Sequence, residues 1–197
     1  MTETQQRVRA WEDRYRQGKT AWDRGAVSPA LSRWLDDGLV PPGRVLVPGC
    51  GHGHEVEALV RAGCQVTAVD IAPTPVLRLM ARLADAGLHA NVVQADLLAW
   101  TPAEPFEAIY EQTCLCALDP ADWPAYAQRL AGWLVPGGHL LALFMQTGTE
   151  GGPPYHCALP AMRDLFDERD WLWPPSHPFE IPHPNGLTEL ACVLTRR

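Results

Sequence analysis

The sequence predicts an α/β protein with one doubly wound domain built on a mostly parallel sheet. Short apolar or β-branched runs alternate with segments of helical periodicity from residue 44 onward. A loop with glycines at alternate positions follows the first run, and an aspartate ends the second. Strands separated by helices of this length pair in parallel and carry helices on both faces. A chain of 197 residues suffices for one such domain and is short for two.

The first two strand–helix units cover residues 44–87. Residues 44–48 form an apolar run, the glycine loop follows, and a helix with Val56, Leu59 and Val60 on one face ends at Gly63. The second strand, residues 65–70, ends in an acid. The predicted features of the next helix are a Thr74 cap, Pro75 as first residue and a buried face of Leu77, Met80 and Leu83.

The later elements are less regular. Residues 91–96 and 106–111 have strand character, and Asp119-Pro120 opens a helix whose apolar face carries Trp123, Tyr126, Leu130 and Leu134. Pro136-Gly137-Gly138 is expected to end this helix before a strand at residues 139–145. The predicted tail elements are a short helix at residues 158–166 and closing strands near residues 171–181 and 187–195.

Composition excludes several classes of partner. The formal net charge of −7 disfavours nucleic acid, whose binding depends on clustered cations. No apolar run is long enough to cross a bilayer, and the polar residues 1–16 do not resemble a secretion signal, so we expect a cytoplasmic protein. The six cysteines form no Cys-x-x-Cys pair, and neither a disulfide framework nor a metal site is predicted. The sequence is silent on oligomeric state, and a monomer is favoured.

The glycine loop indicates a ligand at the first strand-to-helix turn. Doubly wound sheets bind ligands at the carboxyl ends of their strands, and Gly49, Gly51 and Gly53 allow close backbone approach. A dinucleotide fingerprint needs its third glycine where His54 stands, which disfavours a nicotinamide-dependent oxidoreductase. The observed spacing, with Asp70 ending the second strand, fits S-adenosylmethionine, whose ribose hydroxyls need a carboxylate but which has no pyrophosphate.

Other interpretations stay open on the residues alone. The loop could be a tight connection without a ligand, and Asp70 could be an ordinary acid at a strand end. Asp96, one strand further on, could meet the edge of an adenine or only form a turn. A non-catalytic module that binds S-adenosylmethionine is a further alternative.

At this point the chain resembles the thiol and halide methyltransferases that belong with the thiopurine S-methyltransferases. The resemblance spans nearly the whole chain. The matching blocks are Trp11-Glu12-x-x-Tyr15-x-x-Gly18-x-Thr20-x-Trp22-Asp23-x-Gly25, Val45 to Gly53, Asp70, Ile109-Tyr110-Glu111-Gln112-Thr113 and Gly151-Gly152-Pro153-Pro154-Tyr155.

The resemblance implies a class I methyltransferase domain over residues 1–197, with a mostly parallel seven-stranded sheet and an antiparallel C-terminal strand. Residues 44–197 form the core, and the helical, aromatic residues 1–43 cover the cofactor site. The cofactor is S-adenosyl-L-methionine and the product S-adenosyl-L-homocysteine. The implied cofactor contacts are Trp11, Tyr15, Trp22, Val47, Gly49, Gly51, Gly53, Asp70, Ile71, Asp96, Leu97, Glu111 and Gln112. The implied substrate contacts are Tyr15, Trp22, Gln112 and Tyr155.

Five positions carry alternatives or departures. Aromatic faces attract a sulfonium cation, but Trp11, Tyr15 and Trp22 could equally be core packing. Tyr15 stands where relatives often carry tryptophan. Gln112 stands where plant halide enzymes carry tyrosine, which weakens a halide preference, and Tyr155 could anchor its proline-rich loop instead of contacting substrate.

The sequence thus predicts methyl transfer to a small soft nucleophile, most readily a thiol or related sulfur species. Halide or thiocyanate, and a thiopurine or other chalcogen compound, are the alternative substrates. In-line displacement requires positioning above all, so no catalytic dyad is assigned. His52 and His54 are expected to face solvent, a base role for His156 ranks low, and the roles of Arg14, Arg16 and Arg24 stay open between steering an anion and solvating a helix.

Overall fold

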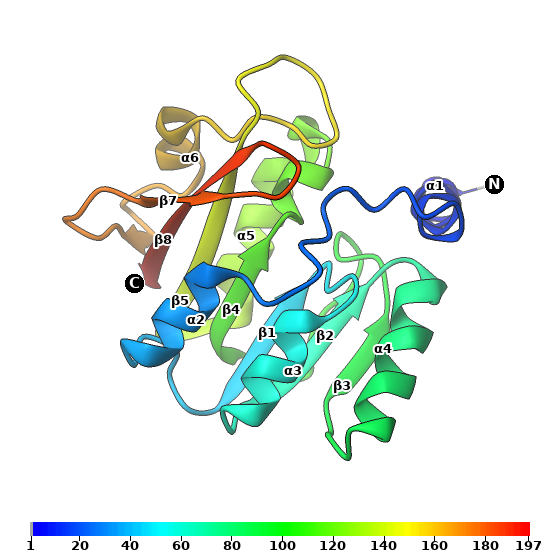
Figure 1. The fold of residues 1–197 in the computed structure, drawn as a ribbon. Coiled ribbons are helices and arrows are strands. Elements are labelled where there is room, and N and C mark those ends of the chain that lie inside the picture. The colour runs from blue at the N-terminus through cyan, green and yellow to red at the C-terminus, as the bar shows by residue number, and fades with distance from the viewer. Residues whose placement is uncertain (1) are drawn as a thin grey trace.

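The computed structural model describes residues 2–197, and its sheet is doubly wound as predicted (Figure 1). The eight strands have the order β3-β2-β1-β4-β5-β8-β6, and β7 pairs with β8. The parallel part consists of β1 (Arg44–Pro48), β2 (Gln65–Asp70), β3 (Asn91–Gln94), β4 (Phe106–Gln112) and β5 (Leu134–Gln146). The C-terminal β8 (Thr188–Arg196) is antiparallel to β5, β6 and β7.

The sheet has eight strands rather than the predicted seven. The closing strand expected at residues 171–181 is divided into β6 (Trp171–Leu172) and β7 (Phe179–Pro182). Pro174 and Pro175 lie between them, and proline cannot donate to a strand ladder. The interruption visible in the sequence therefore splits the strand.

Helices cover both faces of the sheet. One core packs α2 (Pro29–Asp36), α3 (His54–Arg61) and α4 (Pro73–Asp85) on one face. The other core packs α5 (Trp123–Trp133) and α6 (Leu159–Leu165), the predicted tail helix, on the opposite face. Two 3₁₀ turns, η1 (Leu115–Ala117) and η2 (Pro120–Asp122), connect β4 to α5. No helix within residues 2–197 is long and apolar enough to span a membrane.

The predicted start and buried face of α4 were wrong. The helix begins at Pro73 with Ala72 as N-cap, and Thr74 lies in its first turn. Val76, Leu79 and Leu83 are buried, whereas Leu77 and Met80 are 65% and 50% exposed. Both stripes are apolar, so periodicity could not choose between them. Packing against β2 and β3 selects the stripe that contains Leu79.

The boundary between α5 and β5 was also misplaced. The helix ends at Trp133, and Leu134 already pairs with Phe106 of β4. The next ladder pair joins His139 to Ala108, so the extra residues around Gly138 form a bulge instead of a helix end. A Cβ on Gly138 would lie 2.9 Å from the Val135 carbonyl oxygen, which explains the glycine.

The N-terminal segment lies across the carboxyl edge of the parallel strands. Helix α1 (Glu3–Arg16) packs against α4, and the chain then crosses above the strand ends to reach α2 (Figure 1). Thr2 caps α1 with a capping box. Helix α1 and the chain that follows it as far as Trp22 therefore stand over the edge where doubly wound folds bind ligands, whereas α2 packs on one face of the sheet.

Candidate active site

A cavity of about 450 Å³ lies between this N-terminal segment and the carboxyl ends of the strands. Its lining includes part of the predicted site, together with side chains that the sequence did not single out. The predicted contacts that line it are Trp11, Tyr15, Trp22, Gly49, Asp70, Ile71, Asp96 and Leu97. The predicted contacts outside this lining are Val47, Gly51, Gly53, Glu111, Gln112 and Tyr155.

The three loop glycines have different neighbours, although all have positive φ angles of 59°, 50° and 69°. A Cβ on Gly49 would lie 3.0 Å from the Cys114 side chain at the cavity wall, and one on Gly51 3.2 Å from the Tyr15 hydroxyl. A Cβ on Gly53 would lie 2.6 Å from Leu79 of α4. Gly49 and Gly51 thus keep the cavity side open, whereas Gly53 allows two helices to pack.

Asp70 is the buried carboxylate at the end of β2. Its Oδ2 accepts hydrogen bonds from the Gly51 amide at 3.0 Å and the Tyr15 hydroxyl at 3.5 Å, and its Oδ1 accepts from the Ala72 amide at 2.9 Å. Burial raises the pKa of Asp70 to about 6, although these hydrogen bonds oppose the shift. The carboxylate therefore sits at the cavity wall where hydroxyl donors of a ribose could reach it.

Asp96 connects the end of β3 to α1. Its Oδ1 accepts from the Leu98 amide at 3.1 Å, which is the predicted turn. Its Oδ2 accepts from Arg7 Nη2 at 2.6 Å and from Thr4 Oγ1 at 2.9 Å. Burial alone would raise the pKa of Asp96, but these hydrogen bonds, led by that of Arg7, outweigh it and lower the pKa. This carboxylate serves the attachment of α1, which sequence reasoning missed.

A second contact fixes α1 to the start of α4. Glu12 Oε1 accepts from the Thr74 hydroxyl at 2.7 Å, and Glu12 Oε2 accepts from the Thr74 amide at 3.0 Å. Helix α4 has no side-chain cap of its own, so Glu12 satisfies an amide of its first turn. The capping acid comes from another helix, which explains why the predicted Thr74 cap was wrong.

The aromatic residues of the N-terminal block form one wall of the cavity. The Trp22 ring meets the Trp11 ring edge-on with a centroid distance of 5.4 Å, and the Tyr15 ring at 5.5 Å. Burial and the neighbouring Asp70 raise the pKa of Tyr15 above its ordinary value, so its hydroxyl keeps its proton. These rings face the cavity and are also packed against one another.

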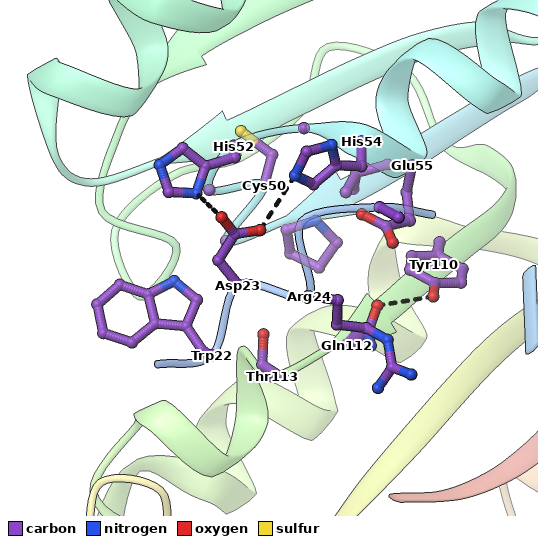
Figure 2. Close-up of a pocket in the computed structure, with 16 residues that line it drawn as sticks. Trp22, Asp23, Arg24, Cys50, His52, His54, Glu55, Tyr110, Gln112 and Thr113 are labelled. Carbon is purple, nitrogen blue, oxygen red and sulfur yellow. Dashed lines mark hydrogen bonds and ion pairs between the residues drawn. The ribbon is translucent and has the colours of Figure 1, made fainter. Parts of the chain in front are cut away.

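A small polar pocket of about 40 Å³ lies behind the glycine loop, and Trp22, Gly49 and Thr113 line both it and the larger cavity (Figure 2). Asp23 bridges the two loop histidines there: its Oδ2 lies 3.1 Å from His52 Nδ1 and its Oδ1 lies 3.0 Å from His54 Nε2. The histidines are half-buried against Asp23 and do not simply face solvent as expected. The predicted contacts Val47, Gly51, Gly53 and Gln112 line this polar pocket.

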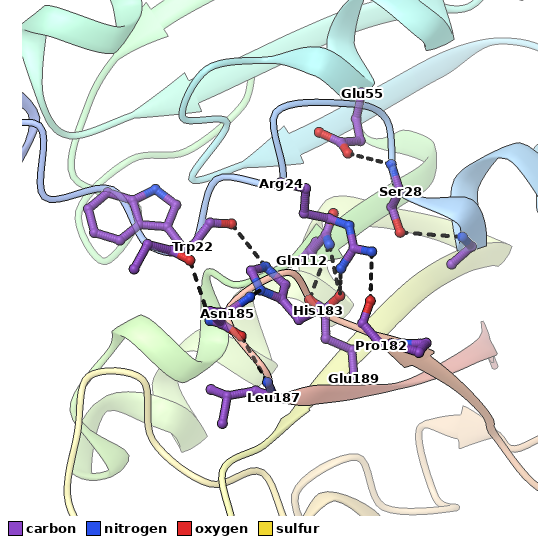
Figure 3. Close-up of polar contacts among 12 residues, drawn as sticks. Trp22, Arg24, Ser28, Glu55, Gln112, Pro182, His183, Asn185, Leu187 and Glu189 are labelled. Carbon is purple, nitrogen blue, oxygen red and sulfur yellow. Dashed lines mark hydrogen bonds and ion pairs between the residues drawn. The ribbon is translucent and has the colours of Figure 1, made fainter.

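Gln112 is fixed by a buried polar network (Figure 3). Its Nε2 donates to both oxygens of Glu189 at 3.1 and 3.0 Å, and its Oε1 accepts from the Tyr110 hydroxyl at 2.8 Å. Arg24 pairs with the same carboxylate at 3.2 Å and donates to the Pro182 carbonyl at 2.8 Å. Burial raises the pKa of Glu189 to about 7. Arg24 therefore anchors the chain after α1 to β8, a role that differs from both anion steering and helix solvation, the two left open by the sequence.

Glu111 and the late loop shape the far side of the cavity. Glu111 Oε1 accepts from the Leu115 amide at 2.6 Å, which holds the turn containing Thr113, a residue at φ 58°. The Tyr155 amide donates to the Cys116 carbonyl at 2.7 Å, and it is the preceding Pro153 and Pro154 that line the cavity. His156 Nδ1 accepts from the Thr147 amide at 3.1 Å, so it holds its own loop.

Comparison with known proteins decides the family. Residues 6–171 match the thiopurine S-methyltransferase family. The chain belongs to that family. Family members use S-adenosylmethionine, so the predicted cofactor-dependent methyltransferase activity is confirmed, and the oxidoreductase and non-catalytic alternatives fail. The individual contacts with cofactor and substrate stay predictions.

The relatives of this family member include plant and bacterial enzymes. Probable thiol methyltransferase 2 of Arabidopsis thaliana is 36% identical over 152 residues, which cover 76% of this chain and 67% of that protein. Thiocyanate methyltransferase 1 of Brassica oleracea is 32% identical, covering 79% of this chain and 70% of that protein. Thiopurine S-methyltransferase of Legionella pneumophila (strain Paris) is 29% identical, covering 74% of each chain.

Solved structures confirm the class I methyltransferase fold. The 1,6-didemethyltoxoflavin-N1-methyltransferase of Burkholderia thailandensis, with bound S-adenosylhomocysteine, has a TM-score of 0.77 at 20% identity, covering 96% of this chain and 86% of that chain. Magnesium protoporphyrin IX methyltransferase of Synechocystis PCC 6803 has a TM-score of 0.74 at 14% identity, covering 100% of this chain and 98% of that chain. At these identities the likeness concerns the fold.

Proposed function

We propose that this family member methylates a small thiol or a related sulfur nucleophile. The observation that carries the proposal is the composition of the two cavity walls. The aromatic wall of Trp11, Tyr15 and Trp22 shares the cavity with an apolar, sulfur-rich wall that includes Cys114, Cys116 and Met145. The lining holds neither histidine nor glutamate, and its two carboxylates are already engaged, Asp70 by backbone amides and Tyr15, and Asp96 by Arg7 and Thr4. A soft nucleophile that ionises by itself suits such a site, because methyl transfer then needs no general base.

The residues present fit S-adenosylmethionine. Asp70, at the end of β2, is suited to its ribose hydroxyls, and Gly49 leaves the loop without a side chain beside the cavity. Trp11, Tyr15 and Trp22 are the residues expected to face its sulfonium. When bound, the cofactor supplies an electrophilic methyl carbon.

The chain contributes positioning and exclusion of water. The aromatic faces attract a cation and keep water, a competing nucleophile, away from it. The substrate sulfur would form its new bond to carbon as the bond from carbon to the sulfonium sulfur breaks, and a thiol proton would pass to solvent. Holding the reacting atoms in line accounts for the rate enhancement without a catalytic dyad.

Two protein thiols lie at the same cavity and do not compete with the substrate. Burial, followed by the nearby Glu111, raises the pKa of Cys114, and burial also raises that of Cys116. Only a thiolate is an effective nucleophile, so both remain unreactive neutral side chains. They offer a polarizable surface to a sulfur substrate instead.

The relatives support sulfur over halide. Thiol and thiopurine methyltransferases appear among them, and both names describe a sulfur acceptor; a thiocyanate methyltransferase also appears, whose acceptor carries sulfur but belongs with the halide alternative stated above. Gln112 stands at the position where plant halide enzymes carry tyrosine. Its side-chain amide donates hydrogen bonds to both carboxylate oxygens of Glu189. We also propose that the protein is a cytoplasmic monomer. Its residues 1–43 would cover the cofactor site.

The test is product formation by the purified chain with S-adenosylmethionine. The acceptors are iodide, thiocyanate, bisulfide, alkyl and aryl thiols and a thiopurine, with products detected by mass spectrometry and headspace analysis. Turnover of sulfur acceptors, lost in Asp70→Ala and Trp22→Ala but kept in the exposed control Glu3→Gln, is the expected result. Turnover of iodide alone, or of none of these acceptors while the cofactor binds, would refute the sulfur assignment.

A further inference from the structure

Cations gather at the mouth of the cavity although the chain carries a formal charge of −7. Arg7, Arg14 and Lys19 all belong to its lining. Arg7 is paired with Glu3 and Asp96. Arg14 is half-buried and Lys19 is exposed, which places both side chains at the rim of the cavity. Neither residue takes part in an ion pair within residues 2–197. Two positive charges without an ion-pair partner among the described residues therefore lie at the rim of this cavity.

The backbones of Arg14 and Lys19 are joined, and the Arg14 side chain has a fixed neighbour. The Arg14 guanidinium carbon lies 4.8 Å from the centroid of the Trp11 ring, and this stacking leaves its N–H donors free for a ligand. The Lys19 amide donates to the Arg14 carbonyl oxygen at 2.9 Å, so the turn after α1 brings the two residues together. Arg14 also lies in the last turn of α1, where the helix dipole stabilises a positive charge.

The acidic residues of the lining do not cancel these charges. Asp96 is engaged by Arg7 and Thr4, and Asp70 by two backbone amides and Tyr15. An anion at the rim would meet Arg14 and Lys19 without a competing free carboxylate beside them. The donor geometry of arginine is well suited to a carboxylate.

Part of the same cavity is apolar. Leu118, Met145, Pro153 and Pro154 line the same cavity. We infer that Arg14 and Lys19 bind the anionic end of the substrate, and that the substrate class is a thiol whose apolar body carries a carboxylate. This inference rests on the proposed function and names the substrate class for it.

The experiment compares 3-mercaptobenzoate with its methyl ester, which has the same aromatic body without the charge. The proteins are the parent chain, Arg14→Gln, Lys19→Gln and the double variant. Arg61→Gln is the matched control, because Arg61 also occupies the last turn of a helix, α3, but does not line the cavity. The readouts are kcat/KM from S-adenosylhomocysteine formation, calorimetric binding of both compounds to the S-adenosylhomocysteine complex, and the Kd for S-adenosylmethionine.

The double variant is expected to lose about fivefold to thirtyfold in kcat/KM for the acid, the size of two partly exposed charge contacts. The ester, the cofactor Kd and the Arg61→Gln control should stay unchanged, and added salt should weaken the preference of the parent chain for the acid. Equal losses for acid and ester, or weaker binding of the cofactor, would overturn the inference, because the cations would then serve the fold or the cofactor.

Calorimetry separates this inference from the proposed function. If neither compound is methylated but the acid still binds more tightly through Arg14 and Lys19, the sulfur-methylation proposal fails and the anion site stands. If the parent chain binds acid and ester equally, the anion site fails whether or not both are methylated.

Discussion

Replacing Gly53 by alanine tests whether the third loop glycine serves packing instead of the ligand. Its φ is 69°, and a Cβ there would lie 2.6 and 2.7 Å from the two methyl carbons of Leu79, which is fully buried. The left-handed conformation costs a non-glycine residue about 1–2 kcal/mol, and overpacking of a core costs about 1–3 kcal/mol. Gly53→Ala should therefore destabilise the protein by about 2–5 kcal/mol.

The control is Gly63→Ala. Gly63 also has a positive φ, 89°, but nothing lies within 4 Å of a Cβ built there. It should lose only the conformational part, about 1–2 kcal/mol. Urea unfolding at constant pH and ionic strength measures both variants, and the difference between them isolates the overlap with Leu79.

A double-mutant cycle sharpens the test. Leu79→Ala alone leaves a cavity and costs about 2–5 kcal/mol. In the Gly53→Ala background, Leu79→Ala also removes the overlap between the two side chains. The double variant should therefore be destabilised by about 1–3 kcal/mol less than the sum of the two single variants. Additive losses, or equal destabilisation by Gly53→Ala and Gly63→Ala, would refute the packing role.

Further predictions concern the attachments of the cover and the buried acids. Glu12→Ala should cost about 1–2 kcal/mol in urea unfolding, because it removes the cap of α4, while the exposed Glu3→Gln should cost little. Asp23→Asn removes the charge between His52 and His54 beside the glycine loop, so calorimetry should show weaker cofactor binding; unchanged affinity would show that this pocket does not support the cofactor site. Burial raises the pKa of Glu111 to about 7, so its carboxyl holds a proton more readily in the folded chain than in the unfolded one. The stabilising contribution of Glu111 to folding is present below about pH 4.5 and is lost as the pH rises to about 7. The free energy of unfolding of the parent should therefore fall between pH 5 and pH 8 by up to about 3 kcal/mol more than that of Glu111→Gln. Identical pH profiles of the two proteins would contradict this.

Local signals in the sequence were sufficient for the fold class and for the residues at the ends of β1 and β2. Strand and helix periods predict parallel pairing, and Gly49 and Asp70 follow directly from their place at strand ends. The stripe that α4 buries could not be predicted, because two apolar stripes compete and only packing against β2, β3 and the Gly53 backbone decides between them. The bulge in β5 likewise depends on its pairing with β4.

The contacts that attach the N-terminal residues to the core could not be predicted from the sequence either, for a different reason. Arg7 and Asp96 are 89 residues apart, and Arg24 and Glu189 are 165 residues apart. Neither pair has a local spacing that marks it, and each of these residues alone has the pattern of an ordinary surface charge. Only the crossing of the chain above the strand ends brings the partners together, which is why the role of Arg24 stayed open until the topology was known.

The way in which the cover is held bears on turnover. Only Glu12 and Tyr15 are buried among the fourteen residues of α1, whereas the layers on the two faces of the sheet are joined by extensive apolar cores. Polar contacts at partly exposed sites each contribute about 1 kcal/mol, far less than the burial of an apolar helix face. Releasing α1 therefore costs less than opening the sheet. Because the cavity lies between α1 and the strand ends, we expect ligand exchange to require movement of α1 while the core, with Asp70 and the glycine loop, stays folded.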